Sequence, residues 1–126
     1  MFSREKNLDF KQAIRDCTIV DNELLLHEFS NGNTLTAGTN CYGNYVVRLL
    51  EYSESDDIVY CFLLTSCDYQ AYISGHCNLI ETLNKSLLAY QLVYFTPGFN
   101  ATTITVTATT VNNVVKSWHG SNDSVV

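Results

Sequence analysis

Residues 45–66 decide the fold class of this chain. Residues 45–52 read YVVRLLEY, residues 58–66 read IVYCFLLTS, and the acidic segment 53–57, SESDD, joins them. Both apolar runs are rich in β-branched and aromatic residues, so both predict strands. The joining segment is shorter than the roughly dozen residues that a parallel crossover needs, so the strands form an antiparallel hairpin. In residues 58–66 apolar side chains occur at both odd and even positions, which point to opposite faces of a strand. This pattern predicts a central strand covered on both faces.

Two segments show the periodicity of helices that pack on a sheet. In residues 4–16 the apolar side chains fall on one helical face, and Ser3 is a suitable N-cap. In residues 79–90 leucines recur at helical spacing, and Asn78 with Glu81 three positions later resembles a capping box. The sequence therefore predicts an N-terminal helix over about 4–16 and a second helix over about 79–90.

Further strands complete the predicted sheet. A hairpin is expected over residues 18–29, with its turn at Asp21 and Asn22. The other expected strands cover residues 34–39, 69–74, 92–96 and 102–111. A length of 126 residues allows one domain and not two. The predicted fold class is α+β: a single domain, residues 1–126, with an antiparallel β-sheet of about five to seven strands and both helices packed on it.

The composition excludes several classes of function. Hydrophobic residues make up 46% of the chain and charged residues 16%, so the chain can form a core and is not a disordered tail. A net charge of −6 argues against a nucleic-acid partner, because phosphate backbones attract basic surfaces. No segment approaches the roughly 20 apolar residues of a membrane span. The charged N-terminal residues do not resemble a secretory signal, so a cytoplasmic location is expected.

The five cysteines, at positions 17, 41, 61, 67 and 77, are the main candidates for chemistry. Their odd number and the expected location favour free thiols. Cys61, Cys67, His76 and Cys77 lie close in sequence, but no Cys-x-x-Cys pair provides the usual zinc spacing. A nucleophilic Cys67 or Cys77 would need an imidazole such as that of His76 as its base. We therefore expect no metal site, no cofactor and no enzymatic activity.

Three groups of residues are candidate partner-binding surfaces. They are the acidic Glu54, Asp56 and Asp57, the basic Arg4, Lys11 and Arg15, and the hydroxyl-bearing Thr103, Thr105 and Thr107. The acidic group would attract a basic protein, and the basic stripe of the N-terminal helix would contact an acidic one. The threonine strand lacks the charges that protect an edge from pairing. It is therefore either a solvent-exposed face of the sheet or an edge strand that pairs with another chain.

These observations favour a small acidic, non-enzymatic protein-binding module that occupies a protein partner, as inhibitors, immunity proteins and accessory proteins do. A basic partner is favoured, and a homodimer is expected. Many Asn, Ser and Thr residues with few charges fit a viral or mobile-element product. One alternative is a self-assembling structural subunit of a viral or other particle. A second alternative is an enzyme that depends on a cysteine and a histidine.

Overall fold

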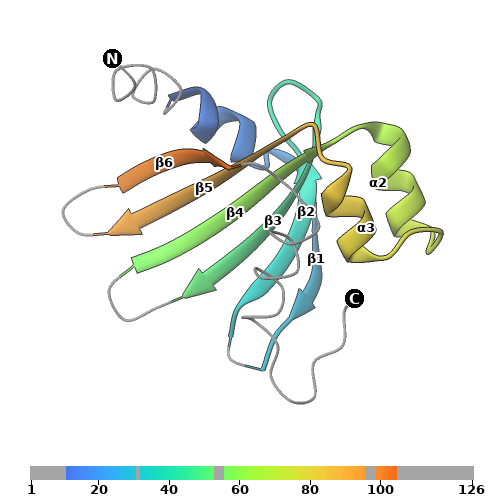
Figure 1. Ribbon diagram of the computed structural model, residues 1–126, viewed down its shortest axis with the longest axis horizontal. Helices are drawn as coiled ribbons and strands as arrows, with labels where there is room; N and C mark the ends of the chain where they lie inside the picture. Colours follow the sequence, from blue (N-terminus) through green and yellow to red (C-terminus); the bar gives the residue numbers. More distant parts are fainter. Residues whose placement is uncertain (1–10, 31, 53–55, 96–98, 105–126) are drawn as a thin grey trace.

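The computed structural model describes residues 11–30, 32–52, 56–95 and 99–104. Six strands form one antiparallel sheet whose order follows the sequence, β1-β2-β3-β4-β5-β6 (Figure 1). The strands are β1 (Asp21–Glu28), β2 (Thr34–Thr39), β3 (Tyr45–Tyr52), β4 (Asp56–Leu64), β5 (Leu88–Phe95) and β6 (Phe99–Ile104). Residues 11–17 are helical, and α2 (Ser66–Ile73) and α3 (Leu79–Asn84) connect β4 to β5. The predicted α+β class is confirmed.

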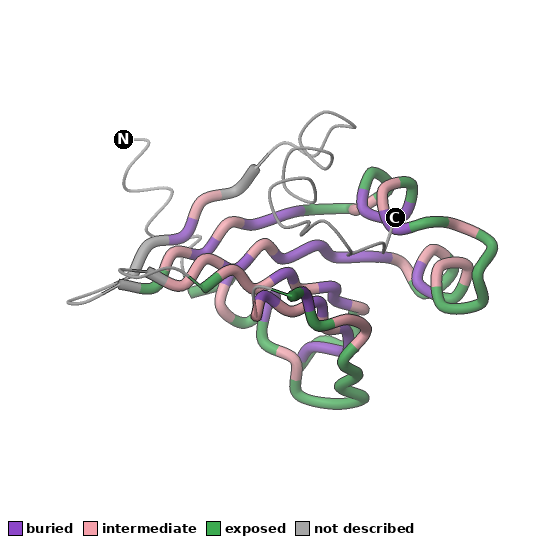
Figure 2. The backbone as a smooth tube through the Cα atoms, turned by 90° about the horizontal axis from the view of Figure 1, so that it is seen from below, coloured by how far each residue is buried: buried purple, intermediate pink, exposed green. Residues whose placement is uncertain are grey.

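The sheet has a buried core on each face. The first core consists of Phe29, Leu35, Ala37, Val47, Leu49, Phe62, Leu64, Tyr69, Leu79, Leu83 and Ala89. The second core consists of Ala13, Cys17, Val46, Val59, Cys61, Leu63, Tyr90, Leu92 and Ala101. Thus α2 and α3 cover the first core, and the helical residues 11–17 cover the second, while buried residues run through the central strands (Figure 2).

The central strand β4 has the predicted two-sided burial. Cys61 belongs to the second core and Phe62 to the first, as the alternation of a pleated strand requires. β4 pairs with β3 on one side and with β5 on the other. The prediction that this strand is central and covered on both faces is therefore confirmed.

Buried polar contacts hold the helical residues 11–17 against the sheet. The hydroxyl of Tyr90 donates to Oδ2 of Asp16 over 2.9 Å, and Gln12 Nε2 donates to Oδ1 of Asp16 over 3.0 Å. Asn40 Nδ2 donates to the backbone oxygen of Asp16 over 3.1 Å. Both oxygens of this buried carboxylate accept hydrogen bonds, which offsets the cost of removing its charge from water.

We expect Tyr90→Phe to lower the free energy of unfolding by about 1.5–3 kcal/mol, because the buried Asp16 carboxylate loses a hydrogen bond to a charged group. Tyr52→Phe is the control, since Tyr52 is exposed and lies outside this network, and it should change stability by less than about 0.5 kcal/mol. Urea denaturation followed by circular dichroism measures both. Equally small effects would contradict a stabilising role for the buried contact.

Gly38 allows the segment that leads into β1 to cross β2 closely. A Cβ atom built at Gly38 lies 2.9 Å from the backbone oxygen of Asp21 and closer still to Cγ2 of Ile19. Ile19 packs against the second core, and Asp21 is paired with Thr39 of β2. A larger residue would have to push this backbone away from the sheet, so the close approach requires glycine.

The predicted second helix over residues 79–90 is wrong in its C-terminal half. α3 ends at Asn84, and the backbone N–H of Leu87 donates to the oxygen of Leu63 in β4 over 2.8 Å. β5 then begins at Leu88 and pairs along the length of β4. Pairing with a central strand provides hydrogen-bond partners for the backbone N–H and C=O groups of this segment and buries its alternate side chains. Together these effects override a weak local preference for helix.

The predicted strand over residues 69–74 is also wrong, because α2 occupies this position. Thr65 is the N-cap, and its side-chain oxygen accepts a hydrogen bond from the N–H of Asp68 over 3.1 Å. Tyr69 is buried in the first core. A threonine followed three residues later by an acid is a helix start signal, and it indicates this helix better than the short apolar pattern indicates a strand.

The predicted hairpin over residues 18–29 does not form. β1 runs from Asp21 to Glu28 as one strand and pairs with β2. Asn22 does have a positive φ of 56°, but it lies beside a register shift between Asp21 and Leu24. The residue that suggested a turn therefore sits in a β-bulge, where an extra residue is accommodated without reversing the chain.

The remaining boundaries differ less from the predictions. β2 and β3 have the predicted bounds, and β4 begins and ends two residues before the predicted 58–66. β5 includes all but the last residue of the predicted 92–96, and β6 begins three residues before the predicted 102–111. Residues 4–10 of the N-terminal helix and residues 105–111 of the last strand lie outside the described residues.

Candidate protein-binding surface

Strand β1 forms one edge of the sheet, since β2 is its only partner among the described strands. Two leucines near its centre are exposed, Leu24 to 47% and Leu25 to 57% of their surface. Val20, just before the strand, is exposed to 59%. Burying apolar surface is favourable by about 25 cal/mol per Å², so a partner that covers these side chains is bound more tightly.

The two leucines lie on opposite faces of this edge. The register pairs Leu24 with Ala37, a member of the first core, and Leu25 with Thr36. Directly paired residues share a face and successive residues alternate, so Leu24 is on the first-core face and Leu25 on the second-core face. A partner that rests on one face reaches one leucine, whereas a strand added beside β1 places side chains next to both.

The edge strand is acidic. Asp21, Glu23 and Glu28 are exposed, and the strand sequence DNELLLHE contains no lysine or arginine. His27 is half-buried, and its ring lies edge-on to Phe29 with a centroid separation of 4.7 Å. The charged groups that β1 presents to solvent are therefore carboxylates, which attract basic partners.

Two register shifts interrupt the pairing of β1 with β2. One lies between Asp21 and Leu24, and the other between Leu25 and His27. Bulges and charged side chains are the usual devices that keep an edge strand from pairing with any available chain. β1 thus combines exposed apolar area with a restricted pairing geometry, which favours specific binding over nonspecific association.

The acidic segment 53–57, predicted to connect two strands, is partly strand in the structure. Asp56 and Asp57 are the first residues of β4, and Asp57 is half-buried opposite Tyr52 and Tyr94 in the neighbouring strands. Glu54 lies outside the described residues. The expectation that residues 53–57 join the two strands as a solvated loop is therefore wrong for the last two residues, because Asp57 pairs with both neighbouring strands and Asp56 pairs with Phe95 of β5.

The predicted basic stripe lies on a separate part of the molecule. Lys11 and Arg15 are exposed on the helical residues 11–17, and Arg4 lies outside the described residues. Figure 1 shows this helix near one end of the sheet and the start of β4, which carries Asp56 and Asp57, near the other. The acidic and basic groups predicted from the sequence therefore do not form one surface.

The predicted threonine surface is described only at its start. Thr103 is in β6, the last strand of the described sheet, and pairs with Tyr90. The side chain of Thr103 and all of Thr105 and Thr107 lie outside the description, so pairing of this strand with another chain stays a prediction.

The thiols occupy two kinds of environment. Cys17 and Cys61 are buried in the second core, whereas Cys41 and Cys67 are exposed and Cys77 is partly exposed. Burial raises the pKa of the Cys61 thiol well above its ordinary value, and hydrogen bonding with Cys17 raises it further. The buried Cys61 thiol is therefore held in its neutral, unreactive form.

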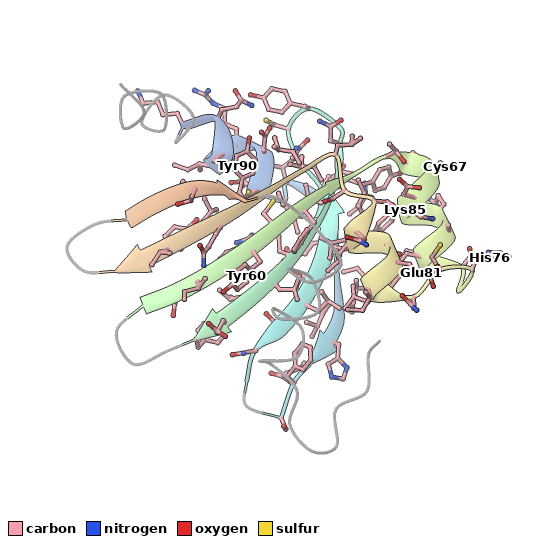
Figure 3. The ribbon with its side chains drawn as sticks, viewed as in Figure 1. Tyr60, Cys67, His76, Glu81, Lys85 and Tyr90 are labelled. Carbon is pink, nitrogen blue, oxygen red and sulfur yellow. The ribbon has the colours of Figure 1, made fainter. Side chains whose placement is uncertain are left out.

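The exposed polar groups near α2 and α3 do not assemble a cysteine–histidine pair. The Nδ1 atom of His76 lies 2.7 Å from the hydroxyl of Ser74, while Lys85 Nζ lies 3.3 Å from Sγ of Cys77. Figure 3 shows His76 and Lys85 beside the helices α2 and α3. The imidazole is thus bonded to a hydroxyl, and the thiol to an ammonium. Within the described ranges, no group of three or more His, Cys, Asp or Glu side chains is arranged to hold a metal ion.

Comparisons of the chain with protein-family models, with curated proteins and with solved structures gave no match. In the part of the chain that the structure describes, no helix combines the length and the apolar character needed to cross a membrane.

Proposed function

We propose that this protein is a small, non-enzymatic module that binds a basic segment of a protein partner along the edge of β1. One observation carries the proposal: exposed leucines lie on both faces of an edge strand whose exposed charges are all acidic. An extended segment that pairs with β1 would cover both leucines at once. Its lysines or arginines would lie near Glu23 and its neighbours, and the charge of the chain would steer the encounter.

A second copy of the chain fits β1 poorly. If two β1 strands paired antiparallel about the Leu24–Leu25 bond, Asp21 of each would face Glu28 of the other. Like charges directly opposite each other destabilise a strand pair. This register therefore disfavours a homodimer through β1. Dimerisation through another surface, such as β6, stays a separate prediction that light scattering on the full chain tests.

The proposal is tested with a defined probe, a fluorescent ten-residue peptide of alternating lysine and valine. We expect saturable binding by fluorescence anisotropy, with changes in the nuclear magnetic resonance signals of the β1 amides. A peptide with glutamate in place of lysine should bind at least about tenfold more weakly, because its charges repel β1. A lysine–valine peptide methylated on alternate backbone nitrogens should also bind more weakly, because it cannot complete the hydrogen-bond ladder.

Paired variants separate binding at β1 from attraction to an acidic chain. Glu23→Lys and Glu81→Lys change the net charge equally, and both residues are exposed, but only Glu23 lies in β1. We expect Glu23→Lys to weaken binding about fivefold and Glu81→Lys to change it less than twofold. Equal effects of the two variants, or full binding of the methylated peptide, would refute strand addition at β1.

A further inference from the structure

The eight residues of β1 lie beside only six residues of β2 (Figure 1). Asp21 pairs with Thr39 at one end, and Glu28 pairs with Thr34 at the other. The two register shifts account for the difference, because each places one extra residue in β1 and none in β2. β2 also pairs residue by residue with β3, so β2 is a regular strand. A regular strand added along the outer side of β1 covers the same length and therefore also needs about six residues.

The extra residues change which side chains of β1 share a face. Asp21 and Leu24 are opposite alternate residues of β2 on the first-core face. Leu25 and Glu28 are opposite alternate residues on the second-core face. In a strand without bulges, residues three positions apart point to opposite faces. In β1, each face instead carries one exposed leucine and one exposed acid that are three positions apart.

An added antiparallel strand would meet these four side chains at fixed positions. Counted from its N-terminus as in β2, its first residue is opposite Glu28 and its third is opposite Leu25. Its fourth residue is opposite Leu24, and its sixth is opposite Asp21. Opposite charges and apolar pairs stabilise directly facing positions of antiparallel strands. The complementary residues are therefore basic at the first and sixth positions and apolar at the third and fourth.

We propose that the partner of β1 contains a six-residue extended segment in which two adjacent apolar residues are flanked, two positions away on each side, by Lys or Arg. The apolar pair covers Leu24 and Leu25, and the basic residues face Asp21 and Glu28. This spacing rests on the strand addition proposed above and names the kind of segment that the edge selects. A strictly alternating segment has all its basic residues on one face, so it places a positive charge opposite only one of the two acids.

The test compares two fluorescent peptides of identical composition, with blocked ends, on the full-length chain. One has the sequence KTVVTK, and its isomer VTKKTV exchanges the lysine and valine positions. We expect KTVVTK to bind about tenfold more tightly by fluorescence anisotropy, because the isomer places lysines against leucines and valines against acids.

The outcomes separate this spacing from strand addition itself. Equal affinities of the two isomers, or tighter binding of VTKKTV, would overturn the spacing while binding of the alternating lysine–valine peptide still supports strand addition. If neither KTVVTK nor the alternating peptide binds, both the spacing and the strand addition are overturned.

A charge exchange at Glu28 tests the register and the direction of the added strand. Glu28→Lys should weaken binding of KTVVTK about fivefold. The peptide ETVVTK should regain that loss on the variant, because its first residue faces position 28. KTVVTE has the same composition but places its glutamate opposite Asp21, so it should not regain the loss. Recovery with KTVVTE, or with neither peptide, would overturn the proposed register.

The matched control for this exchange is Glu81→Lys, which changes the net charge equally at an exposed position of α3. We expect it to change the affinity for KTVVTK less than about twofold. Circular dichroism of both variants verifies that the fold is intact. A fivefold loss in Glu81→Lys as well would show that the net charge of the chain, and not a pairing with Glu28, determines the binding.

Discussion

Replacement of Phe62 by alanine is expected to lower the free energy of unfolding by about 3–5 kcal/mol. Phe62 is fully buried at the middle of the central strand β4, where it packs in the first core beneath α2 and α3. Its removal loses the transfer free energy of the ring and leaves a cavity that two paired strands prevent from collapsing. Urea denaturation followed by circular dichroism measures the loss against the unmodified chain.

The control for this prediction is Leu25→Ala, which removes an apolar side chain at the exposed edge. We expect it to change stability by less than about 0.5 kcal/mol, because Leu25 is mostly in water in the folded state. A loss below about 1 kcal/mol for Phe62→Ala would show that the first core is loosely packed. The same Leu25 variant is expected to weaken peptide binding, so one substitution separates stability from partner binding.

The features predicted correctly from the sequence are those set by neighbouring residues. The apolar runs of β3 and β4 and their short connection determine a central antiparallel hairpin. Asn78 caps α3 as predicted, with its side-chain oxygen accepting from the N–H of Glu81 over 2.8 Å. A cap needs only residues three positions apart, so it can be recognised without knowledge of the tertiary structure.

The features predicted wrongly depend on partners far along the chain. Residues 88–90 satisfy a helical pattern, but β4 is available to pair with them, and the sequence does not state which strands meet. Asn22 suits both a turn and a bulge, and the pairing of β1 with β2 decides between them. Local propensity leaves such choices open, and tertiary pairing resolves them.

The candidate surface was missed for the same reason. Three consecutive leucines at positions 24–26 suggest a buried strand, yet their exposure depends on β1 lying at the edge of the sheet. The acids at both ends of the strand were the available signal, since charge on an edge strand is a common protection against unwanted pairing. The predicted acidic, basic and threonine groups were chosen by charge and alternation alone, which do not reveal strand order.

The boundary between α3 and β5 provides the last prediction. In a helix over residues 79–90, Leu83 and Leu87 would share one buried face; in the structure Leu83 is fully buried and Leu87 is 69% exposed. We therefore expect Leu83→Ala to cost about 2–5 kcal/mol of unfolding free energy and Leu87→Ala less than about 0.5 kcal/mol. Both variants remove the same side chain, so the comparison depends mainly on how deeply each leucine is buried. Comparable losses at the two positions in urea denaturation would mean that the helix continues to residue 90 and that β5 does not begin at Leu88.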